Sequence, residues 1–315
     1  MRELFITKQF NAFHQEIIDA ADQIMRQYAM QGYDLSLRQL YYQFVAHRGL
    51  ENSEKNYKML GNVITDARLA GELDWSYLVD RGRYTSTNPH WESPAHILRS
   101  VAAQYKIDMW ENQPYHVEVM VEKQALEGVL QPVCADMDVP FTSNKGYSSA
   151  SAMYRMGKRL KAILTSGKSV VILYLGDHDP SGIDMTRDVE DRLRLFSGTG
   201  WWSYILKEVA PTSEYYDKFF VKRVALNMEQ VYEYGPPPNP AKLSDSRAKQ
   251  YIREYGTESW ELDALDPNTL AALVTSHIDE YIDQGKLAET QERLTKERGY
   301  LQSLSDNYKP EEEND

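Results

Sequence analysis

Two aspartates with the spacing of a metal-binding pair stand in the segment GDHDPSG, directly after the apolar run SVVILYL. Asp177 and Asp179 are two residues apart, so on extended backbone their carboxylates point to the same side, and His178 between them points away. Such hard oxygen ligands suit Mg²⁺, which commonly takes one or two carboxylates and keeps water and phosphate in the rest of its shell. Taken alone, the pair is better explained by a loop aspartate that caps the following helix, where Asp184 also lies.

A third carboxylate, Glu122, ends the predicted strand VEVMV and is followed by Lys123. The carboxyl ends of parallel strands meet at one edge of a sheet, where open α/β proteins place their ligands. If the two strands are neighbours, Glu122 reaches the same edge as Asp177 and Asp179, where it would complete a metal site or act as a general acid or base. By itself, a glutamate at a strand end is usually a solvated terminus.

A different chemistry is indicated by LSLRQLYYQF, in which Arg38 precedes Tyr41 and Tyr42. On a helix, Arg38 and Tyr42 are four residues apart and share one face. A phenol has a pKa of ~10, so a nucleophilic tyrosine needs a cation or a base beside it. An arginine one turn away stabilises the phenolate and binds phosphate. Most such pairs on amphipathic helices serve only packing.

Four basic residues are candidates for contact with a nucleic-acid backbone. Two of them follow the third predicted helix, in the segment WSYLVDRGRY, and two lie close to the predicted carboxylate edge. By default each is a solvated surface cation, as are the cations of residues 155–161. The four candidates are Arg81, Arg83, Lys123 and Lys145.

The composition limits the classes of protein. The chain has 315 residues and a formal net charge of −12, from 35 Lys and Arg against 47 Asp and Glu. Bulk electrostatics therefore disfavours DNA binding, which is predicted to be weak without divalent metal and strongly sensitive to salt. A P-loop and an H-E-x-x-H motif are absent from the sequence. With the single cysteine Cys134 and only short apolar runs, a cytoplasmic protein without disulfides or membrane spans is expected.

The elements that must position these residues fall into two parts. Apolar residues recur at helical spacing over residues 10–30, 36–45 and 53–69, with Ser36 as the predicted N-cap of the second helix. Three helices followed by a short basic ribbon outline a winged-helix domain, with a plain helical bundle as the alternative. A polar linker over residues 85–94 and a helix over residues 95–110 are expected next.

The second part alternates strands and helices. Strands are predicted over residues 117–121, 139–143, 169–177 and 219–226, with helices beginning near residues 125, 150 and 183. The continuous apolar run 169–177 is typical of a parallel strand that is buried on both faces. This alternation predicts an α/β fold with a largely parallel sheet, followed by a helical C-terminal elaboration and an acidic tail.

The order of these motifs resembles one known family. An S-x-R-x-x-YY helix is followed by V-E-K at a strand end, a G-Y-S-S turn, G-D-x-D-P-x-G-I-D after a buried strand, and then VKRVAL, PPPNPAK and WELDAL. The series is similar to the A subunit of type IIB topoisomerases (topoisomerase VI) and to the related meiotic double-strand-break transesterase. The resemblance covers about residues 35–278, and the short chain is most like the stand-alone "mini-A" proteins of this family.

The resemblance implies a winged-helix, DNA-binding domain over residues 1–90, a linker and helix over 91–113, a Toprim metal domain over 114–280 and a helical acidic tail over 281–315. It implies that Tyr42 is the nucleophile, with Arg38 beside it, and that Glu122, Asp177 and Asp179 hold Mg²⁺, for which Mn²⁺ would substitute. Glu122 would also take part in catalysis. Family members act on double-stranded DNA as homodimers, in which the tyrosine of one protomer meets the metal site of the other. Because this sequence encodes no ATPase, strand passage would need a separate B-type subunit.

The leading hypothesis is therefore a Mg²⁺-dependent enzyme that breaks both DNA strands and leaves Tyr42 joined to a 5′-phosphate. One alternative is a hydrolytic Toprim nuclease of plasmid or phage defence, in which the carboxylates activate water and Tyr42 is dispensable. The other is a non-catalytic DNA-binding or assembly module. The carboxylates weigh against a pure binding module, because a cluster of negative charge repels phosphate.

Overall fold

The computed structural model describes residues 2–33, 35–79, 88, 90–144, 146, 148–199 and 215–308. The chain begins with three helices, α1 (Ala12–Met30), α2 (Leu37–Arg48) and α3 (Glu54–Leu69), as the apolar spacing predicted. Each has an N-cap side chain that accepts a hydrogen bond from the first turn. At α2 the predicted cap, Ser36, forms a reciprocal capping box with Gln39.

The three helices enclose a core of their own, which includes Ile18, Leu40, Leu60 and Ile64. The ribbon predicted after α3 begins differently, because residues 75–77 form a single 3₁₀ turn, η1 (Trp75–Tyr77). Asp74 accepts hydrogen bonds from the backbone and the hydroxyl of Ser76, and a local side-chain bond of this kind competes with strand pairing. Leu78 then makes one isolated parallel bridge with Leu35. The candidates Arg81 and Arg83 lie outside the described residues.

The second part is built on a four-stranded sheet in the order β2 (Phe141–Ser143), β1 (Tyr115–Val121), β3 (Ser169–Leu175) and β4 (Phe219–Ala225). All three pairings are parallel, so the prediction of a mixed α/β fold with a parallel sheet is confirmed. Val121 pairs with Leu175 at the carboxyl end of the two central strands. The residues that follow these strands therefore emerge side by side.

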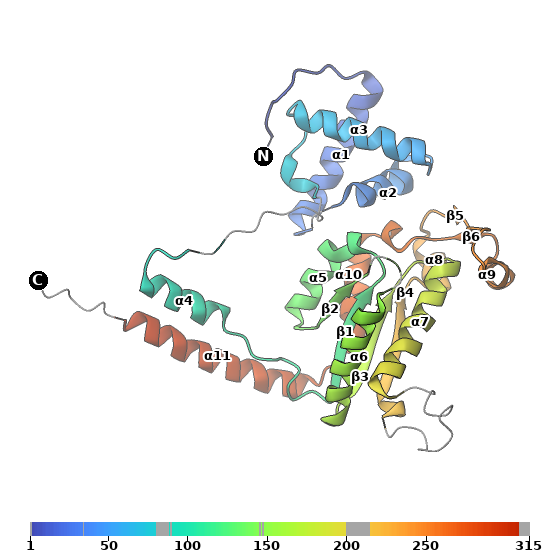
Figure 1. The fold of residues 1–315 in the computed structure, drawn as a ribbon. Helices are drawn as coiled ribbons and strands as arrows, with labels where there is room; N and C mark the ends of the chain where they lie inside the picture. The colour runs from blue at the N-terminus through green and yellow to red at the C-terminus, as the bar shows by residue number, and fades with distance from the viewer. Residues whose placement is uncertain are drawn as a thin grey trace, which may run out of the picture.

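Helices cover both faces of this sheet (Figure 1). One face packs against α5 (Glu127–Asp136) and α10 (Pro267–Asp279), and the other packs against α6 (Ala150–Thr165) and α7 (Pro180–Ser197). Alternate residues of β3 serve the two cores: Leu173 belongs to the first and Ile172 to the second, and both are fully buried. The strand is apolar throughout because neither face meets water.

Short elements surround the carboxyl edge of the sheet. They are η2 (Gln124–Leu126), α8 (Met228–Tyr234), β5 (Asn239–Pro240), α9 (Ala248–Tyr255), β6 (Glu258–Ser259) and η5 (Leu262–Ala264). The short turn η4 (Tyr216–Lys218) lies at the opposite edge, directly before β4. The stretch from β6 to η5 joins the two parts of the molecule. Trp260 pairs with His178 through the backbone, while Ala264 packs in the core of the N-terminal helices.

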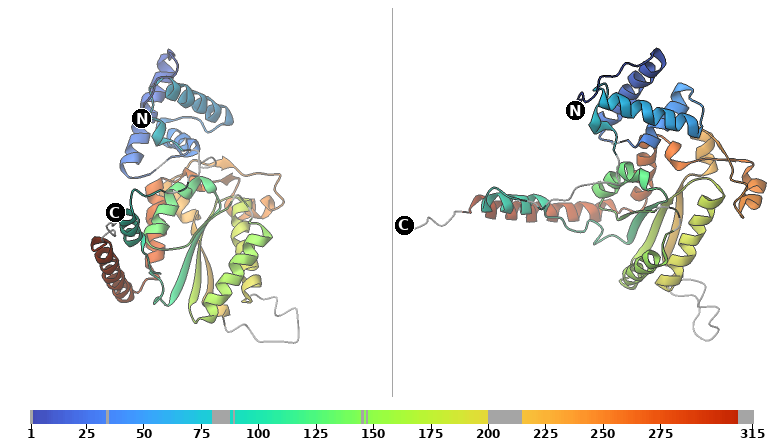
Figure 2. Two further views of the ribbon diagram at one scale, coloured as in Figure 1. Left: turned by 60° about the vertical axis from the view of Figure 1, so that its left-hand side comes forward. Right: turned by 45° about the horizontal axis from the view of Figure 1, so that its top comes forward.

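The helix predicted over residues 95–110 is shorter than expected. The structure has α4 (Pro94–Gln104), which lies beside the long C-terminal helix α11 (Gln284–Asp306), and the two project together from the body (Figure 2). The predicted helix was too long because Trp110 packs in the core of the sheet, where its indole N–H donates to the carbonyl of Met137 at 2.9 Å. The chain has to leave the helix axis to place that ring. Among the described helices, none is long and apolar enough to cross a membrane.

Candidate active site at the carboxyl edge of the sheet

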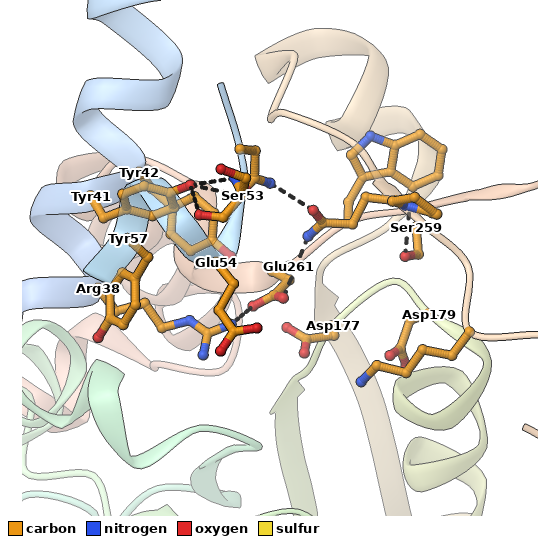
Figure 3. A pocket seen from close by; sticks show the side chains of 15 residues that line it. Arg38, Tyr41, Tyr42, Ser53, Glu54, Tyr57, Asp177, Asp179, Ser259 and Glu261 are labelled. Carbon is orange, nitrogen blue, oxygen red and sulfur yellow. Dashed lines mark hydrogen bonds and ion pairs between the residues drawn. The ribbon is translucent and has the colours of Figure 1, made fainter. Parts of the chain in front are cut away.

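A cavity of about 320 Å³ lies where α2 and the start of α3 face the carboxyl edge of the sheet (Figure 3). The N-terminal helices contribute Arg38, Tyr41 and Tyr42 to its wall, and the segment after β3 contributes Asp177 and Asp179. The remaining wall comes from α3 and its cap and from residues 239–261. The structure therefore brings the predicted tyrosine and the predicted aspartate pair to one cavity, although they are more than a hundred residues apart in the chain.

Glu122 lies directly behind this wall. Because β1 and β3 are neighbours, its Oε2 accepts a hydrogen bond from the backbone N–H of Asp177 at 3.0 Å. Two glycines make room for this approach. A Cβ at Gly176 would lie 2.8 Å from Glu122 Oε2, and a Cβ at Gly182 would lie 2.3 Å from the carbonyl oxygen of Asp177. A larger residue at either position would displace the carboxylate or the loop.

Burial perturbs the two carboxyl groups at this edge. Burial, followed by the nearby charge of Asp177, raises the pKa of Glu122 to about 7. Burial likewise raises the pKa of Asp177 to about 6, in spite of the opposing effect of Lys123. Perturbed carboxyl groups that share a site are typical of functional centres.

The other residues of the GDHDPSG segment have separate tasks. Asp179 is the N-cap of α7, where its Oδ1 accepts from the N–H of Gly182 at 2.6 Å. Capping, the simpler interpretation of the aspartate pair, is therefore part of its role. Asp184 forms ion pairs with Arg187 and with Arg247.

His178 points away from the cavity. Its Nδ1 lies 2.8 Å from the hydroxyl of Tyr251, and its ring is surrounded by Tyr251, Tyr255 and Trp260. Burial, helped by the positive charge of Arg223, lowers its pKa to about 4. The histidine is therefore neutral at pH 7 and belongs to the packing of this edge.

The predicted metal ligands fit Mg²⁺ in chemical kind. Within the described part of the chain, the hydrogen bonds and ion pairs of Asp177 and Asp179 use Oδ1 and those of Glu122 use Oε2. One hard oxygen of each carboxylate is thus left for a ligand. The side chains are not gathered into a finished cage, since no group of three or more His, Cys, Asp or Glu among the residues described is placed to hold an ion.

The two tyrosines of α2 differ in their partners. The hydroxyl of Tyr41 accepts from the N–H of Ser53 at 2.7 Å and lies 3.0 Å from that residue's carbonyl oxygen, so Tyr41 anchors the turn before α3. Tyr42 instead lies beside Arg38, whose guanidinium is 5.9 Å from the centre of its ring, and the charge of Glu261 acts on its phenol. Burial and the charges of Asp263 and Glu261 raise the pKa of Tyr42, and Arg38 only partly offsets them. In this arrangement Tyr42 is a protonated phenol that is 3% exposed.

Sequence reasoning assigned no role to two acidic residues of the WELDAL segment, Glu261 and Asp263. They join the two parts of the molecule through Arg38 and Lys123. Arg38 lies 2.5 Å from Glu261 Oε2 and 3.2 Å from Asp263 Oδ2. Lys123 Nζ lies 2.7 Å from Glu261 Oε2, 2.8 Å from Asp263 Oδ1 and 2.9 Å from Asp177 Oδ1. We call Arg38, Lys123, Glu261 and Asp263 the charge bridge.

The charge bridge is electrostatically matched, unlike the carboxylates behind it. Burial acts to raise the pKa of Glu261, but Lys123 and Arg38 outweigh it and lower the pKa to about 2. Burial likewise acts against the charged form of Lys123, yet the surrounding carboxylates raise its pKa. Lys123, predicted as a DNA contact, is thus held among three carboxylates, and the other candidate from this edge, Lys145, lies outside the described residues. The only available signal for the bridge was the two-residue spacing of the acids in W-E-L-D.

No protein-family model matches the chain, and no curated protein is significantly similar to it. The chain is therefore classified by its fold and its site. It is an α/β protein with a parallel sheet, and the carboxyl edge of this sheet faces a tyrosine and an arginine from the N-terminal helices.

Proposed function

We propose that this chain is a Mg²⁺-dependent DNA-breaking transesterase of the topoisomerase VI A-subunit type, with Tyr42 as its nucleophile. One observation carries the proposal: Tyr42 and Arg38 line the same cavity as Asp177 and Asp179. In this proposal the N-terminal helices belong to a winged-helix, DNA-binding unit and the sheet belongs to a Toprim unit. The enzyme is cytoplasmic, acts as a homodimer and relies on a separate subunit for any ATP-driven step.

The reaction is an exchange of one phosphoester for another. The phenolic oxygen of Tyr42 bonds to a DNA phosphorus, and the bond from that phosphorus to the 3′ oxygen breaks. The phenolic proton passes to solvent, and the 3′ oxygen leaves as a hydroxyl after it gains a proton from solvent. The guanidinium of Arg38 lies 5.9 Å from the centre of the Tyr42 ring. It would bind the phosphate after its ion pair with Glu261 breaks.

Glu122, Asp177 and Asp179 would hold the Mg²⁺ ion. When bound, the ion stabilises the negative charge that develops on the phosphate and on the leaving oxygen. The chain's own contribution is to keep one oxygen of each carboxylate facing the edge while backbone N–H groups hold the others. The raised pKa of Glu122 and of Asp177 supports this assignment, because a bound cation would supply the charge that they lack.

A second candidate function is hydrolysis of DNA at the same carboxylates. The observation that favours it is the state of Tyr42, which is almost fully buried and protonated. A nuclease would activate water at the carboxylate edge and would not need the phenol at all. The two candidates differ in one product, since only the transesterase leaves protein joined to DNA.

The test is incubation of supercoiled plasmid with the full chain and Mg²⁺ or Mn²⁺, quenched with detergent and analysed with and without protease. We expect protein-linked linear DNA from the wild type, and none from Tyr42→Phe or Asp177→Ala. Tyr41→Phe is the matched control and should keep the covalent product, because Tyr41 only anchors a turn. Protein-free breaks that survive Tyr42→Phe and vanish in Asp177→Ala would assign the hydrolytic function instead.

A further inference from the structure

Helix α6 carries a strip of cations on its exposed face. The cations are Arg155, Lys158 and Lys161, and Tyr154 lies on the same face. All four residues are exposed. No acidic residue occurs between Ala150 and Thr165, although acids exceed bases in the whole chain. We call these four residues the basic strip.

The cations of the strip have no carboxylate partner among the described residues. Within the part of the chain that the structure describes, no ion pair is formed by Arg155, Lys158 or Lys161, and Lys158 only contacts the ring of Tyr154 at 5.6 Å. The fourth cation of the helix, Arg159, is different, because it turns to the sheet and pairs with Glu118. The strip is thus the unneutralised side of a helix whose other side is fixed by packing.

The position of the strip follows from the start of α6. Gly146, just before the helix, hydrogen-bonds to the carbonyl of Glu122 at the carboxyl edge. Arg192 of α7, which also pairs with Asp188, donates to the carbonyl of Ser148 beside the helix start. From there α6 runs away from the edge along the face of the sheet (Figure 1). At about 1.5 Å per residue, the three cations of the strip lie roughly 8 to 17 Å along the helix from its first residue.

We propose that the basic strip binds the phosphate backbone of duplex DNA on one flank of the break, outside the cavity that holds Tyr42. This inference rests on the proposed function for the nature of the ligand. Its own support is charge complementarity and continuity with the carboxylate edge. The cations rise by about 4.5 Å per step of three residues, a spacing that lets long, flexible lysine and arginine side chains reach successive phosphates of one strand. Tyr154 would pack against a deoxyribose or hold Lys158 in place.

The strip supplies what the acidic chain otherwise lacks. The cavity is lined by more carboxylates than cations, with Arg38 and Lys242 as its two basic residues, so its net charge disfavours phosphate until a divalent cation is present. A cationic surface next to that wall would hold the duplex while the edge stays negative. It follows that part of the DNA affinity is independent of Mg²⁺ and is located on α6.

The experiment measures binding of fluorescent duplexes by anisotropy, in EDTA, over a range of salt concentrations, with the full chain carrying Tyr42→Phe to prevent cleavage. The strip variant adds Arg155→Glu, Lys158→Glu and Lys161→Glu. A control variant receives the same change in charge at exposed cations of α9 and α11. Its three substitutions are Lys249→Glu, Arg253→Glu and Lys296→Glu.

We expect the strip variant to bind at least ~10-fold more weakly than the control variant, with a slope of log affinity against log salt that is smaller by about 3. Equal affinities and equal slopes in the two variants would overturn the inference, as would a loss of binding to vesicles of anionic lipid without a loss of binding to DNA. Thermal unfolding of both variants checks that they are folded. Single substitutions, Lys158→Gln and Lys161→Gln, give the same test without charge reversal.

Failure of this inference is distinguishable from failure of the proposed function. If the strip variant loses DNA binding but the wild type forms no covalent adduct, the strip is a DNA-binding surface and the transesterase proposal is wrong. If the wild type forms the adduct and the strip variant binds as the control does, the transesterase proposal holds and the strip is not a DNA contact.

Discussion

Strand β1 carries the buried Glu118, and Glu122 follows directly after it. The pKa of Glu118 is lowered and the pKa of Glu122 is raised. Glu118 is 1% exposed and lies between His116 and Arg159. Burial acts to raise its pKa, but these two partners outweigh burial and lower it. Glu122 is 7% exposed at the carboxyl end of the strand, and burial, followed by the charge of Asp177, raises its pKa.

The comparison shows that burial does not by itself assign a role to a carboxylate. A buried charge with a matched partner fixes the packing of an element, here α6 against the sheet. A buried carboxylate without its countercharge costs stability, and it is retained where something from outside completes it. The same residue type on the same strand thus serves structure at one end and, in our proposal, chemistry at the other.

The largest expected difference between the two glutamates is in DNA breakage. Glu122→Gln removes one charge from the proposed Mg²⁺ ligands, so we expect the rate of breakage to fall by about 10²–10³-fold or more. Glu118→Gln should leave the rate within a few fold, because Glu118 faces α6 and not the cavity. Rates are measured on plasmid at saturating Mg²⁺. Equal losses in the two variants would break the comparison.

The second difference is in how stability depends on pH, because the pKa shifts of Glu122 and Glu118 have opposite signs. The folded pKa of Glu122 lies above its usual value of 4.5, so the free energy of unfolding falls as pH rises from about 4.5 to 7 in metal-free buffer. At about 1.36 kcal/mol per pKa unit, the loss is roughly 3 kcal/mol. The folded pKa of Glu118 is lowered, so its contribution is present above pH ~4.5 and is lost as the pH falls through the folded pKa.

Urea unfolding between pH 4 and 8, in EDTA, measures both effects. Glu122→Gln should flatten the decline above pH 4.5, and at pH 8 this variant should be more stable than the wild type. Glu118→Gln should be less stable than the wild type at pH 8 by about 2 kcal/mol, because it leaves half-exposed Arg159 without its partner. A Glu122→Gln variant that is destabilised at pH 8 would contradict the assignment of excess negative charge to this edge.

A smaller effect is expected from the metal itself. An ion that binds only the folded protein stabilises it by mass action, and a concentration of Mg²⁺ about ten times its dissociation constant corresponds to about 1.4 kcal/mol. The wild type should be stabilised by millimolar Mg²⁺ at pH 8, with a proton released below pH 7, and Glu122→Gln should not. Thermal unfolding and calorimetry provide readouts that do not depend on activity. Equal stabilisation of wild type and variant would place the ion elsewhere.

The smallest effect concerns Arg38, whose side chain is 48% exposed. Because solvent screens its ion pairs with Glu261 and Asp263, Arg38→Gln should change the free energy of unfolding by under ~1 kcal/mol. DNA breakage should nevertheless fall, since the variant lacks the cation beside Tyr42. Matched urea unfolding and cleavage assays separate the two. A large loss of stability would mean that the charge bridge, rather than apolar packing, holds the two parts together.

Much of the fold could be predicted because local signals agreed with the tertiary structure. Ser36 before an amphipathic run marked the start of α2, and the unbroken apolar run before Gly176 marked a strand buried on both faces. The proximity of Glu122 and Asp177 followed from one assumption, that their strands are parallel neighbours, which the pairing of β1 with β3 confirms. The predicted helix over residues 95–110 was too long, because a tertiary contact of Trp110 beyond α4 leaves no signal in the local sequence pattern.

The charge bridge could not have been predicted from the sequence. Glu261 lies between β6 and η5 and Asp263 lies within the single turn of η5, and so short a stretch has no periodicity that shows which way a side chain faces. Their partners, Arg38 and Lys123, come from a helix in the other part of the molecule and from a strand end. Only the docking of the N-terminal helices on the carboxyl edge brings the four together, and that docking leaves no mark in local sequence.

The charge bridge also sets an order of events during synthesis of the protein. The ribosome releases Tyr42 and its helix long before it reaches Glu261, and the N-terminal helices have a core that allows them to form early. Until residues 261 and 263 emerge, Arg38 and Lys123 have none of their bridge partners from that segment, and the tyrosine is not yet set against the carboxylate edge. If Tyr42 is the nucleophile, as we propose, a nascent chain carries it before the carboxylate edge is complete, and the ability to break DNA arises only late in translation.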